Sequence, residues 1–189
     1  MKKAFGILLL LIFTGSFAFT QPEDFKPGSE PSGFRGIPWG EPLSALKQMR
    51  LTWDGGERKY YEREEDLLEL GGARLRRIVY VFWEEKFSEV RLDILRDYNN
   101  LQDEFADFKT LRGVCFERFG TRRKPIFGGE TYSWYGHTSW LRLIRDDPGV
   151  LSLTMGSTKL LEQRKSHEDE QQRSYVEVRK QKATKGIGF

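Results

Sequence analysis

The sequence contains one cysteine and two histidines, and each shortage excludes a class of chemistry. Because Cys115 is alone, no internal disulfide can form, and the fold must rest on an ordinary apolar core. A catalytic thiol needs a base such as His137 within reach and an exposed, positive setting, whereas Cys115 falls on the apolar face of an expected helix. His137 and His167 do not have the spacing of metal ligands. The sequence therefore predicts a non-enzymatic protein with no cofactor and no metal site.

A long apolar run is also missing. The N-terminal apolar segment from Ala4 to Phe13 covers about ten residues, whereas a helix that spans a bilayer needs roughly 20. Lys2 and Lys3 precede this segment, and Ser16-Phe17-Ala18 follows it in the small-x-small pattern of a cleavage site. The order predicts a signal peptide over residues 1–18 and a periplasmic or secreted protein. No membrane span is expected after cleavage.

Neither sign of charge dominates. The formal net charge is +3, from 31 basic and 28 acidic residues, and removal of Lys2 and Lys3 leaves 29 basic residues against the same 28. A chain with so balanced a charge is not typical of a nucleic-acid-binding protein, which carries a basic face. The sequence therefore predicts no nucleic-acid partner.

What the sequence does contain is a strong hairpin signal between Leu75 and Ile94. An unbroken β-branched and aromatic run, from Ile78 to Trp83, has the composition of a central strand. After a polar turn at Glu84-Glu85-Lys86, apolar residues from Val90 to Ile94 alternate with charged ones, as in a strand with one wet face. Both faces of the first strand are apolar, so we expect both to be at least partly covered.

The remaining segments are expected to cover or extend this hairpin. Apolar spacing predicts a short helix from Glu41 to Met49 and a longer one from Leu101 to Phe119. Further strands are expected at residues 57–63, 131–135, 138–145 and 150–155. The sequence thus predicts an α+β fold, with an antiparallel sheet packed on helices and an α-β-β-β order that occurs twice, as in a tandem repeat. The expected organisation is a signal peptide (1–18), a flexible leader (19–32), one α+β domain (33–157) and a charged tail (158–189), helical or disordered.

Several short motifs stand out between about Gly33 and Ser157: Gly33-Phe34-Arg35-Gly36-Ile37-Pro38-Trp39-Gly40, Ile78-Val79-Tyr80-Val81-Phe82-Trp83, Lys86-Phe87, Phe116-Glu117-Arg118-Phe119-Gly120 and Tyr132-Ser133-Trp134. Together they resemble a group of small exported bacterial proteins to which no catalytic residues are assigned, and the likeness covers this range. The order of a helix followed by hairpins also resembles the architecture of the β-lactamase inhibitor protein and of the BamE-like outer-membrane assembly lipoproteins. The chain lacks the lipid-bearing cysteine of the latter group, and fold analogy does not establish function.

The aromatic residues around the 131–140 hairpin are the sequence's candidate surface. Tyr132 and Trp134 fall on one face of the expected strand and Tyr135 on the other, more aromatic side chains than one core readily takes. One interpretation is that Trp134 and Trp140 are core residues and that the tyrosines pack at an edge. The other is that Tyr132, Trp134 and Tyr135 form a surface for a partner or ligand. The sequence therefore favours an exported interaction or adaptor module with a partner in the cell envelope. The alternative is a small-ligand-binding domain with a pocket between sheet and helices.

Overall fold

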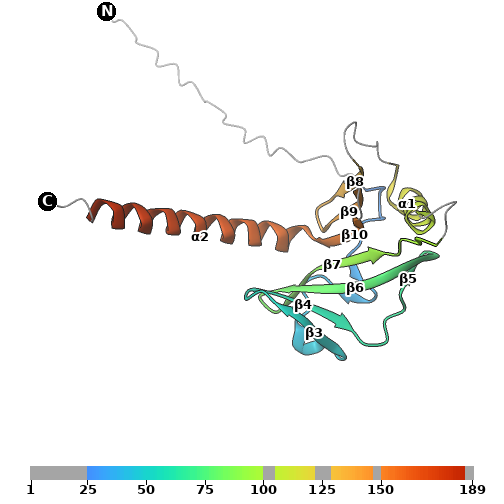
Figure 1. Ribbon diagram of the computed structural model, residues 1–189, viewed down its shortest axis with the longest axis horizontal. Coiled ribbons are helices and arrows are strands. Elements are labelled where there is room, and N and C mark those ends of the chain that lie inside the picture. Colours follow the sequence, from blue (N-terminus) through green and yellow to red (C-terminus); the bar gives the residue numbers. More distant parts are fainter. Residues whose placement is uncertain (1–24, 100–104, 122–128, 147–149, 186–189) are drawn as a thin grey trace, which may run out of the picture.

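The computed structural model describes residues 25–99, 105–121, 129–146 and 150–185, and its main element is an eight-stranded antiparallel sheet (Figure 1). Seven strands follow one another across the sheet in the order β3, β4, β6, β7, β10, β9, β8, and the short β5 pairs with β6. The strands are β3 (Met49–Asp54), β4 (Arg58–Arg63), β5 (Glu69–Leu70), β6 (Ala73–Trp83), β7 (Lys86–Ile94), β8 (Glu130–Tyr135), β9 (Ser139–Asp146) and β10 (Val150–Ser157). With helices α1 (Ala106–Phe119) and α2 (Thr158–Lys185), this arrangement confirms the predicted α+β class.

The hairpin of β6 and β7 lies at the middle of the sheet, as predicted. Its turn consists of Glu84 and Glu85, both with positive φ, which is the backbone of the tightest hairpin connections. Along β6 all six residues from Ile78 to Trp83 are at most 6% exposed. Both faces of this strand are therefore covered.

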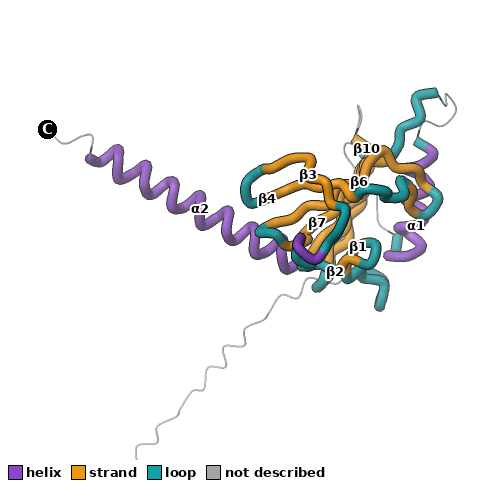
Figure 2. The backbone as a smooth tube through the Cα atoms, turned by 90° about the horizontal axis from the view of Figure 1, so that it is seen from below, coloured by secondary structure: helices purple, strands orange, loops and turns teal. Residues whose placement is uncertain are grey.

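One face of the sheet, which we call the helix-covered face, carries the main core. Ile78, Tyr80 and Phe82 point to this face, and α1 packs against it through Phe108, Leu111, Cys115 and Phe119. The N-terminal segment with β1 (Gly33–Phe34) and β2 (Ile37–Pro38) lies on the same side (Figure 2). Its Trp39 ring is 5.0 Å from that of Phe87. Helix α1 and the N-terminal segment thus share one face of the sheet.

The prediction of a helix from Glu41 to Met49 is wrong. A single 3₁₀ turn, η1 (Leu43–Ala45), follows Pro42, and the strand β3 begins at Met49. The aromatic and β-branched residues after Met49 favour a strand, and pairing with β4 satisfies their backbone groups. The order is therefore not a regular repeat: four long strands precede α1, three strands precede α2, and each half ends in its helix.

Residues 25–32, expected as part of a flexible leader, pack on the body of the protein. Phe25 is 7% exposed and its ring meets that of Phe119 edge-on at 5.5 Å. The carboxylate of Glu30 accepts hydrogen bonds from the backbone N–H groups of Thr138 and Ser139. The Lys26 backbone N–H also donates to the carbonyl of Phe119, so this segment is held by both packing and hydrogen bonds. The expected signal peptide, residues 1–18, lies outside the described residues.

Helix α2 begins directly after β10 and extends away from the sheet (Figure 1). Leu160 is buried, and Arg164 and His167 are partly covered by the sheet, whereas the residues from Glu168 to Gln181 are exposed. The imidazole of His167 lies 2.9 Å from a carboxylate oxygen of Glu57 in the β3–β4 turn. The start of the helix is therefore docked and its far half stands clear of the sheet.

Candidate interaction surface

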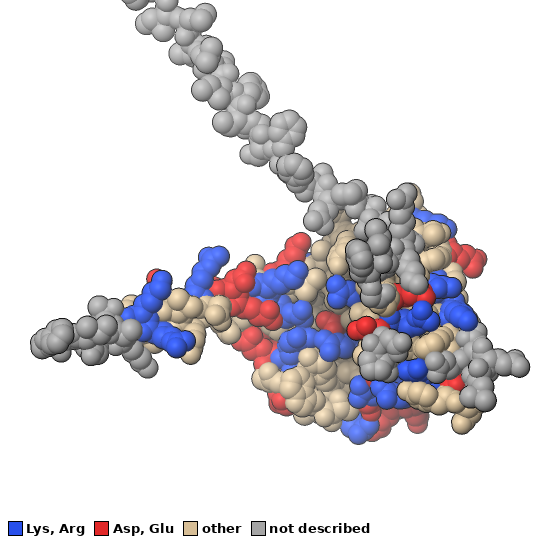
Figure 3. All heavy atoms as spheres, turned by 45° about the horizontal axis from the view of Figure 1, so that its top comes forward, with Lys and Arg blue, Asp and Glu red and all other residues tan. Residues whose placement is uncertain are grey.

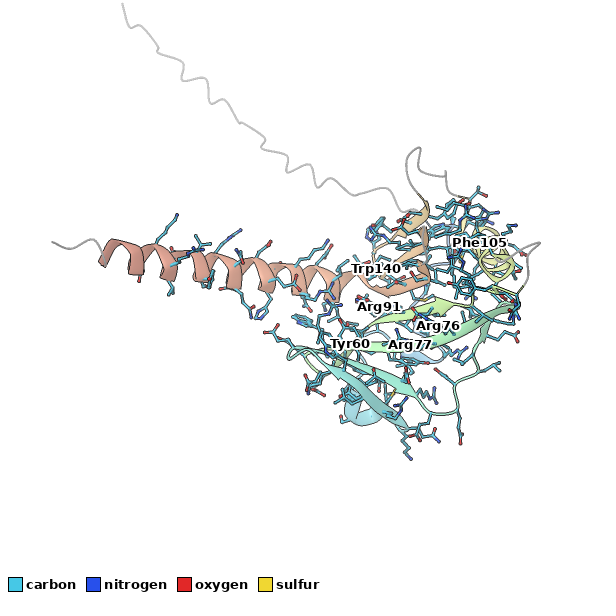
Figure 4. The ribbon with its side chains drawn as sticks, in the orientation of Figure 1. Tyr60, Arg76, Arg77, Arg91, Phe105 and Trp140 are labelled. Carbon is cyan, nitrogen blue, oxygen red and sulfur yellow. The ribbon has the colours of Figure 1, made fainter. Side chains whose placement is uncertain are left out.

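The other face of the sheet, which we call the open face, has no helix across it within the described part of the chain. It is formed by alternate residues of five neighbouring strands, and its centre holds Arg58, Tyr60, Val79, Val81, Glu89, Arg91, Thr154, Gly156, Trp140 and Arg142. The first turns of α2 border it and close a hollow of about 540 Å³. In Figure 4, Tyr60, Arg91 and Trp140 lie over the sheet near the base of α2.

Strand register arranges this face in two rows that cross the strands. One row contains Val79, Arg91, Thr154, Arg142 and Ser133, each directly opposite the next. The neighbouring row contains Tyr60, Val81, Glu89, Gly156, Trp140 and Tyr135. The first row places two arginines two strands apart, with a small threonine between them. The second places aromatic rings at both ends.

Arginine side chains take the place of a covering helix at the centre of the open face. The Arg58 and Arg91 guanidinium carbons lie 5.6 and 5.4 Å from the centre of the Tyr60 ring, distances at which a cation is attracted to an aromatic face. The ring of the exposed Trp53 lies on the other side of this group, 4.7 Å from the Tyr60 ring and tilted to it by 54°. Long arginine stems can cover apolar surface while their charged ends stay wet, which explains how Val81 is fully buried without a helix above it.

Glu89 is the buried acid of this face, with a side chain only 5% exposed. Its carboxylate accepts a hydrogen bond from Arg91 Nε, and Arg58 and Arg164 lie farther away, at 3.9 and 3.6 Å. Burial lowers and the Glu89 carboxylate raises the pKa of Arg91, with a net upward shift. The single Glu89 carboxylate therefore lies near three guanidinium groups and accepts a hydrogen bond only from that of Arg91.

The hollow as a whole has an excess of positive charge. Five basic side chains, those of Arg58, Arg91, Arg142, Arg164 and Lys165, line it with only two acidic ones, Glu89 and Asp93. Asp93 is already bonded by Arg77 at 2.9 Å and by Arg76 at 3.2 Å. Figure 3 shows basic side chains on the body next to α2. An almost neutral chain thus concentrates an excess of three positive charges in one hollow.

The three residues predicted from the sequence to form a surface lie on opposite faces of the sheet. Tyr132 is 4% exposed and Trp134 is fully buried, because both point to the helix-covered face. The Trp134 indole donates to the carbonyl of Gly120 at 2.9 Å, and Tyr132 donates to Glu130. These two residues are core residues, so the predicted surface is wrong for them. Tyr135 points the other way, is 41% exposed and lines the hollow.

Of the residues that form the open face, only Tyr135 was predicted from the sequence to be part of a surface. Tyr60 and Trp140 lie on different strands, and the register that aligns them cannot be read from local pattern. A usable signal was the alternation of Glu89, Arg91 and Asp93 with apolar residues, which marks a charged strand face in the middle of a sheet.

Cys115 and His137, the possible thiol–imidazole pair of the sequence, lie in different environments. Cys115 is 1% exposed, and burial raises the pKa of its thiol to about 12, so it is a packing residue. His137 lies exposed in the turn between β8 and β9. Within the described ranges, no group of three or more His, Cys, Asp or Glu side chains is arranged to hold a metal ion. Nor does any helix of those ranges have the length and apolar character to cross a membrane.

A second hollow, of about 280 Å³, lies between α1 and the sheet. It is lined largely by apolar side chains, among them Phe34, Leu111, Val114, Leu153 and Met155. Tyr60, Tyr80 and Trp134 are not part of it: Tyr60 lies on the open face, and the other two are fully buried.

No family model, curated protein or solved structure matches this chain. The resemblances drawn from sequence motifs therefore stay predictions.

Proposed function

We propose that this protein is an exported, non-enzymatic interaction or adaptor module of the bacterial cell envelope, and that its partner binds the open face. The observation that carries the proposal is the array of arginine and aromatic side chains on a sheet face that no helix of the described residues covers. Arginine, tyrosine and tryptophan are the residues that most often dominate binding energy at protein interfaces.

The position of the face also supports the proposal. Its residues are held by strands whose opposite side is the main core, so the binding groups sit on a rigid support. A pre-formed surface loses little conformational entropy when a partner binds. Export is supported by Lys2 and Lys3, the apolar segment after them and the cleavage pattern that ends at Ala18.

The test is capture of envelope proteins by variants that differ only in which face is changed. Arg142→Glu reverses an exposed charge on the open face, whereas Lys47→Glu reverses an exposed charge on the N-terminal segment across the sheet. We expect proteins captured by the wild type from an envelope extract to be lost with Arg142→Glu and kept with Lys47→Glu. Identical capture by all three proteins would contradict the proposed binding face.

Export has its own measurement. Protein purified from the native host should begin at Phe19 when its N-terminus is sequenced. An N-terminus at Met1 or Lys2 would refute this part of the proposal.

A second candidate function is small-ligand binding, favoured by the apolar hollow between α1 and the sheet. Its volume of about 280 Å³ is close to the lower limit of ordinary ligand pockets, roughly 300 Å³. Native mass spectrometry of protein from the host would show a bound small molecule, and Val114→Phe, which fills the hollow, should remove it. A ligand still bound to Val114→Phe would place it elsewhere.

A further inference from the structure

We propose that the hollow on the open face binds carboxylate side chains of an acidic protein segment. This inference rests on the proposed function and specifies the chemistry of the partner. Unfilled hydrogen-bond donors, the distribution of charge and the span of the basic groups support it.

The hollow has buried donors without acceptors. Arg58 Nε, Arg164 Nε and Trp140 Nε1 are buried, and none has a hydrogen-bond partner among the described residues; Arg164 Nε has only an ion-pair contact, 3.5 Å from Glu168 Oε1. All three side chains line the same hollow. A buried donor without an acceptor destabilises a fold, and a group of them in one place requires an explanation. A ligand that brings acceptors and no donors would satisfy these donors once the side chains over them shift.

The Glu89 carboxylate cannot accept hydrogen bonds from all of these donors. A carboxylate offers about four acceptor positions, whereas each guanidinium carries five N–H donors. Glu89 makes its close contact with Arg91 and leaves Arg58 and Arg164 beyond hydrogen-bond distance. A second carboxylate in the hollow would pair with these guanidinium groups in the planar geometry that arginine favours.

Arg58, Arg91 and Arg164 all lie within 3.9 Å of Glu89, but the basic groups as a set extend farther than one small anion can reach. Arg58 lies on β4 and Arg142 on β9, four strand spacings away, which is roughly 19 Å. An extended peptide of about six residues has this length. The occupant is therefore a chain with several carboxylates rather than a single ion.

The aromatic and apolar residues favour a protein over a phosphate polymer. Tyr135, Trp140, Ile144 and Val150 line the hollow together with the arginines, a mixture typical of protein interfaces. A nucleic-acid site normally belongs to a strongly basic domain, whereas this chain has a formal charge of only +3.

The test measures binding of a fluorescein-labelled hexaglutamate peptide to the purified protein by fluorescence anisotropy, with hexaglutamine as the matched control. The double variant Arg142→Gln, Lys165→Gln removes two exposed charges that line the hollow. The control double variant Lys47→Gln, Arg118→Gln removes two exposed charges elsewhere. Both have the same net charge, and thermal melting should confirm that both are folded.

We expect hexaglutamate to bind, hexaglutamine not to bind, and the Kd for hexaglutamate to rise at least about tenfold in the first double variant only. Equal weakening in both variants, or equal binding of the two peptides, would overturn the inference. Tighter binding of a single-stranded oligonucleotide with the same number of charges would also overturn it, in favour of a phosphate polymer.

The two proposals fail in different ways. If an envelope partner is lost with Arg142→Glu but hexaglutamate neither binds nor competes with it, the open face is an interface and the acidic chemistry is wrong. If hexaglutamate binds as expected but no envelope protein is captured, the acidic site stands and the adaptor function is wrong.

Discussion

At the scale of single residues, the open face depends on one glycine. Gly156 lies between Glu89 and Trp140 in the second row of the face. A Cβ atom at this position would come within 2.6 Å of the Ser88 carbonyl oxygen and 3.2 Å of the Trp140 ring. The absence of a side chain therefore lets the indole lie flat over β10.

We predict that Gly156→Ala destabilises the protein by about 1–3 kcal/mol, as expected for overpacking of a tight site. The Ser88 oxygen belongs to the backbone and cannot move aside cheaply. Chemical denaturation should show a lower midpoint, and the fluorescence of the displaced Trp140 should change. Gly113→Ala is the control, because a Cβ there meets nothing within 4 Å, and a similar loss in both variants would argue against this explanation.

The pairing of His167 with Glu57 predicts a pH dependence. The hydrogen bond to Glu57 is the main cause that raises the pKa of His167 above 6.5, and the same bond lowers the pKa of Glu57. Because the folded pKa of His167 is raised, this pair contributes stability below the unfolded value, and the contribution is lost as pH rises through the folded pKa. It is also lost at acid pH, as Glu57 becomes protonated below its lowered pKa.

NMR titration of the His167 ring measures this coupling directly. In Glu57→Gln the pKa of His167 should fall toward 6.5, because the largest cause of its upward shift is removed. Glu170, a charged neighbour with a smaller effect, gives the control variant Glu170→Gln, which should change the pKa less. A pKa of His167 that is the same in Glu57→Gln and in the wild type would show that α2 does not dock on the β3–β4 turn.

At the scale of elements, α2 divides into a docked start and a free end. Arg164 contacts Glu89, and His167 and Gln171 contact Glu57, whereas the residues from Gln172 to Gln181 are exposed. The helix is polar on most sides beyond its docked turns, so the free end gains little from packing.

Two truncations separate the parts of α2. A chain that ends after Gln163 loses Arg164 and uncovers Glu89, and we expect its melting temperature to fall by at least about 3 °C, roughly 1 kcal/mol for a chain of this size. A chain that ends after Gln172 keeps these contacts and should melt with the wild type. Equal melting of the two truncated chains would contradict the docking of the first turns.

The elements differ in how far the sequence could predict them. The β6–β7 hairpin was predictable because its apolar run has the composition of a central strand and no competing helical pattern. The strand β3 was not, because Leu43, Leu46 and Met49 have helical spacing although the chain forms only one 3₁₀ turn there. For the site, side chains alternate between the two faces along β8, so Tyr135 is exposed while Tyr132 and Trp134 are buried. The rows of the open face require the register between β7 and β10, which no local pattern contains.

At the scale of the whole molecule, both faces of the sheet are covered. Apolar side chains of α1 and the N-terminal segment cover one face, and arginine side chains cover the centre of the other. Phe82 is 1% exposed on the helix-covered face, and Val81 is fully buried on the open face. We predict that Phe82→Asp prevents folding, because it buries an unpaired carboxylate. Val81→Asp places its carboxylate beneath the arginine side chains and should fold with lower stability. Circular dichroism and solubility measure the outcome, and a Val81→Asp protein that fails to fold would show that these arginines do not accept a second carboxylate. Leu51→Asp, at a position 47% exposed, is the control and should fold.

The strand order has a consequence for synthesis. The inner edge of β7 pairs with β10, and the paired residues, such as Asp93 and Ser152, are about 60 positions apart. A chain that emerges from its N-terminus therefore completes the first four long strands while β7 still has an unpaired edge, the kind of edge that recruits foreign strands. Contacts this distant in sequence also slow folding. The nascent protein has to be shielded until its last strand arrives, and the slowest step of its maturation should be the joining of its two halves along β7 and β10.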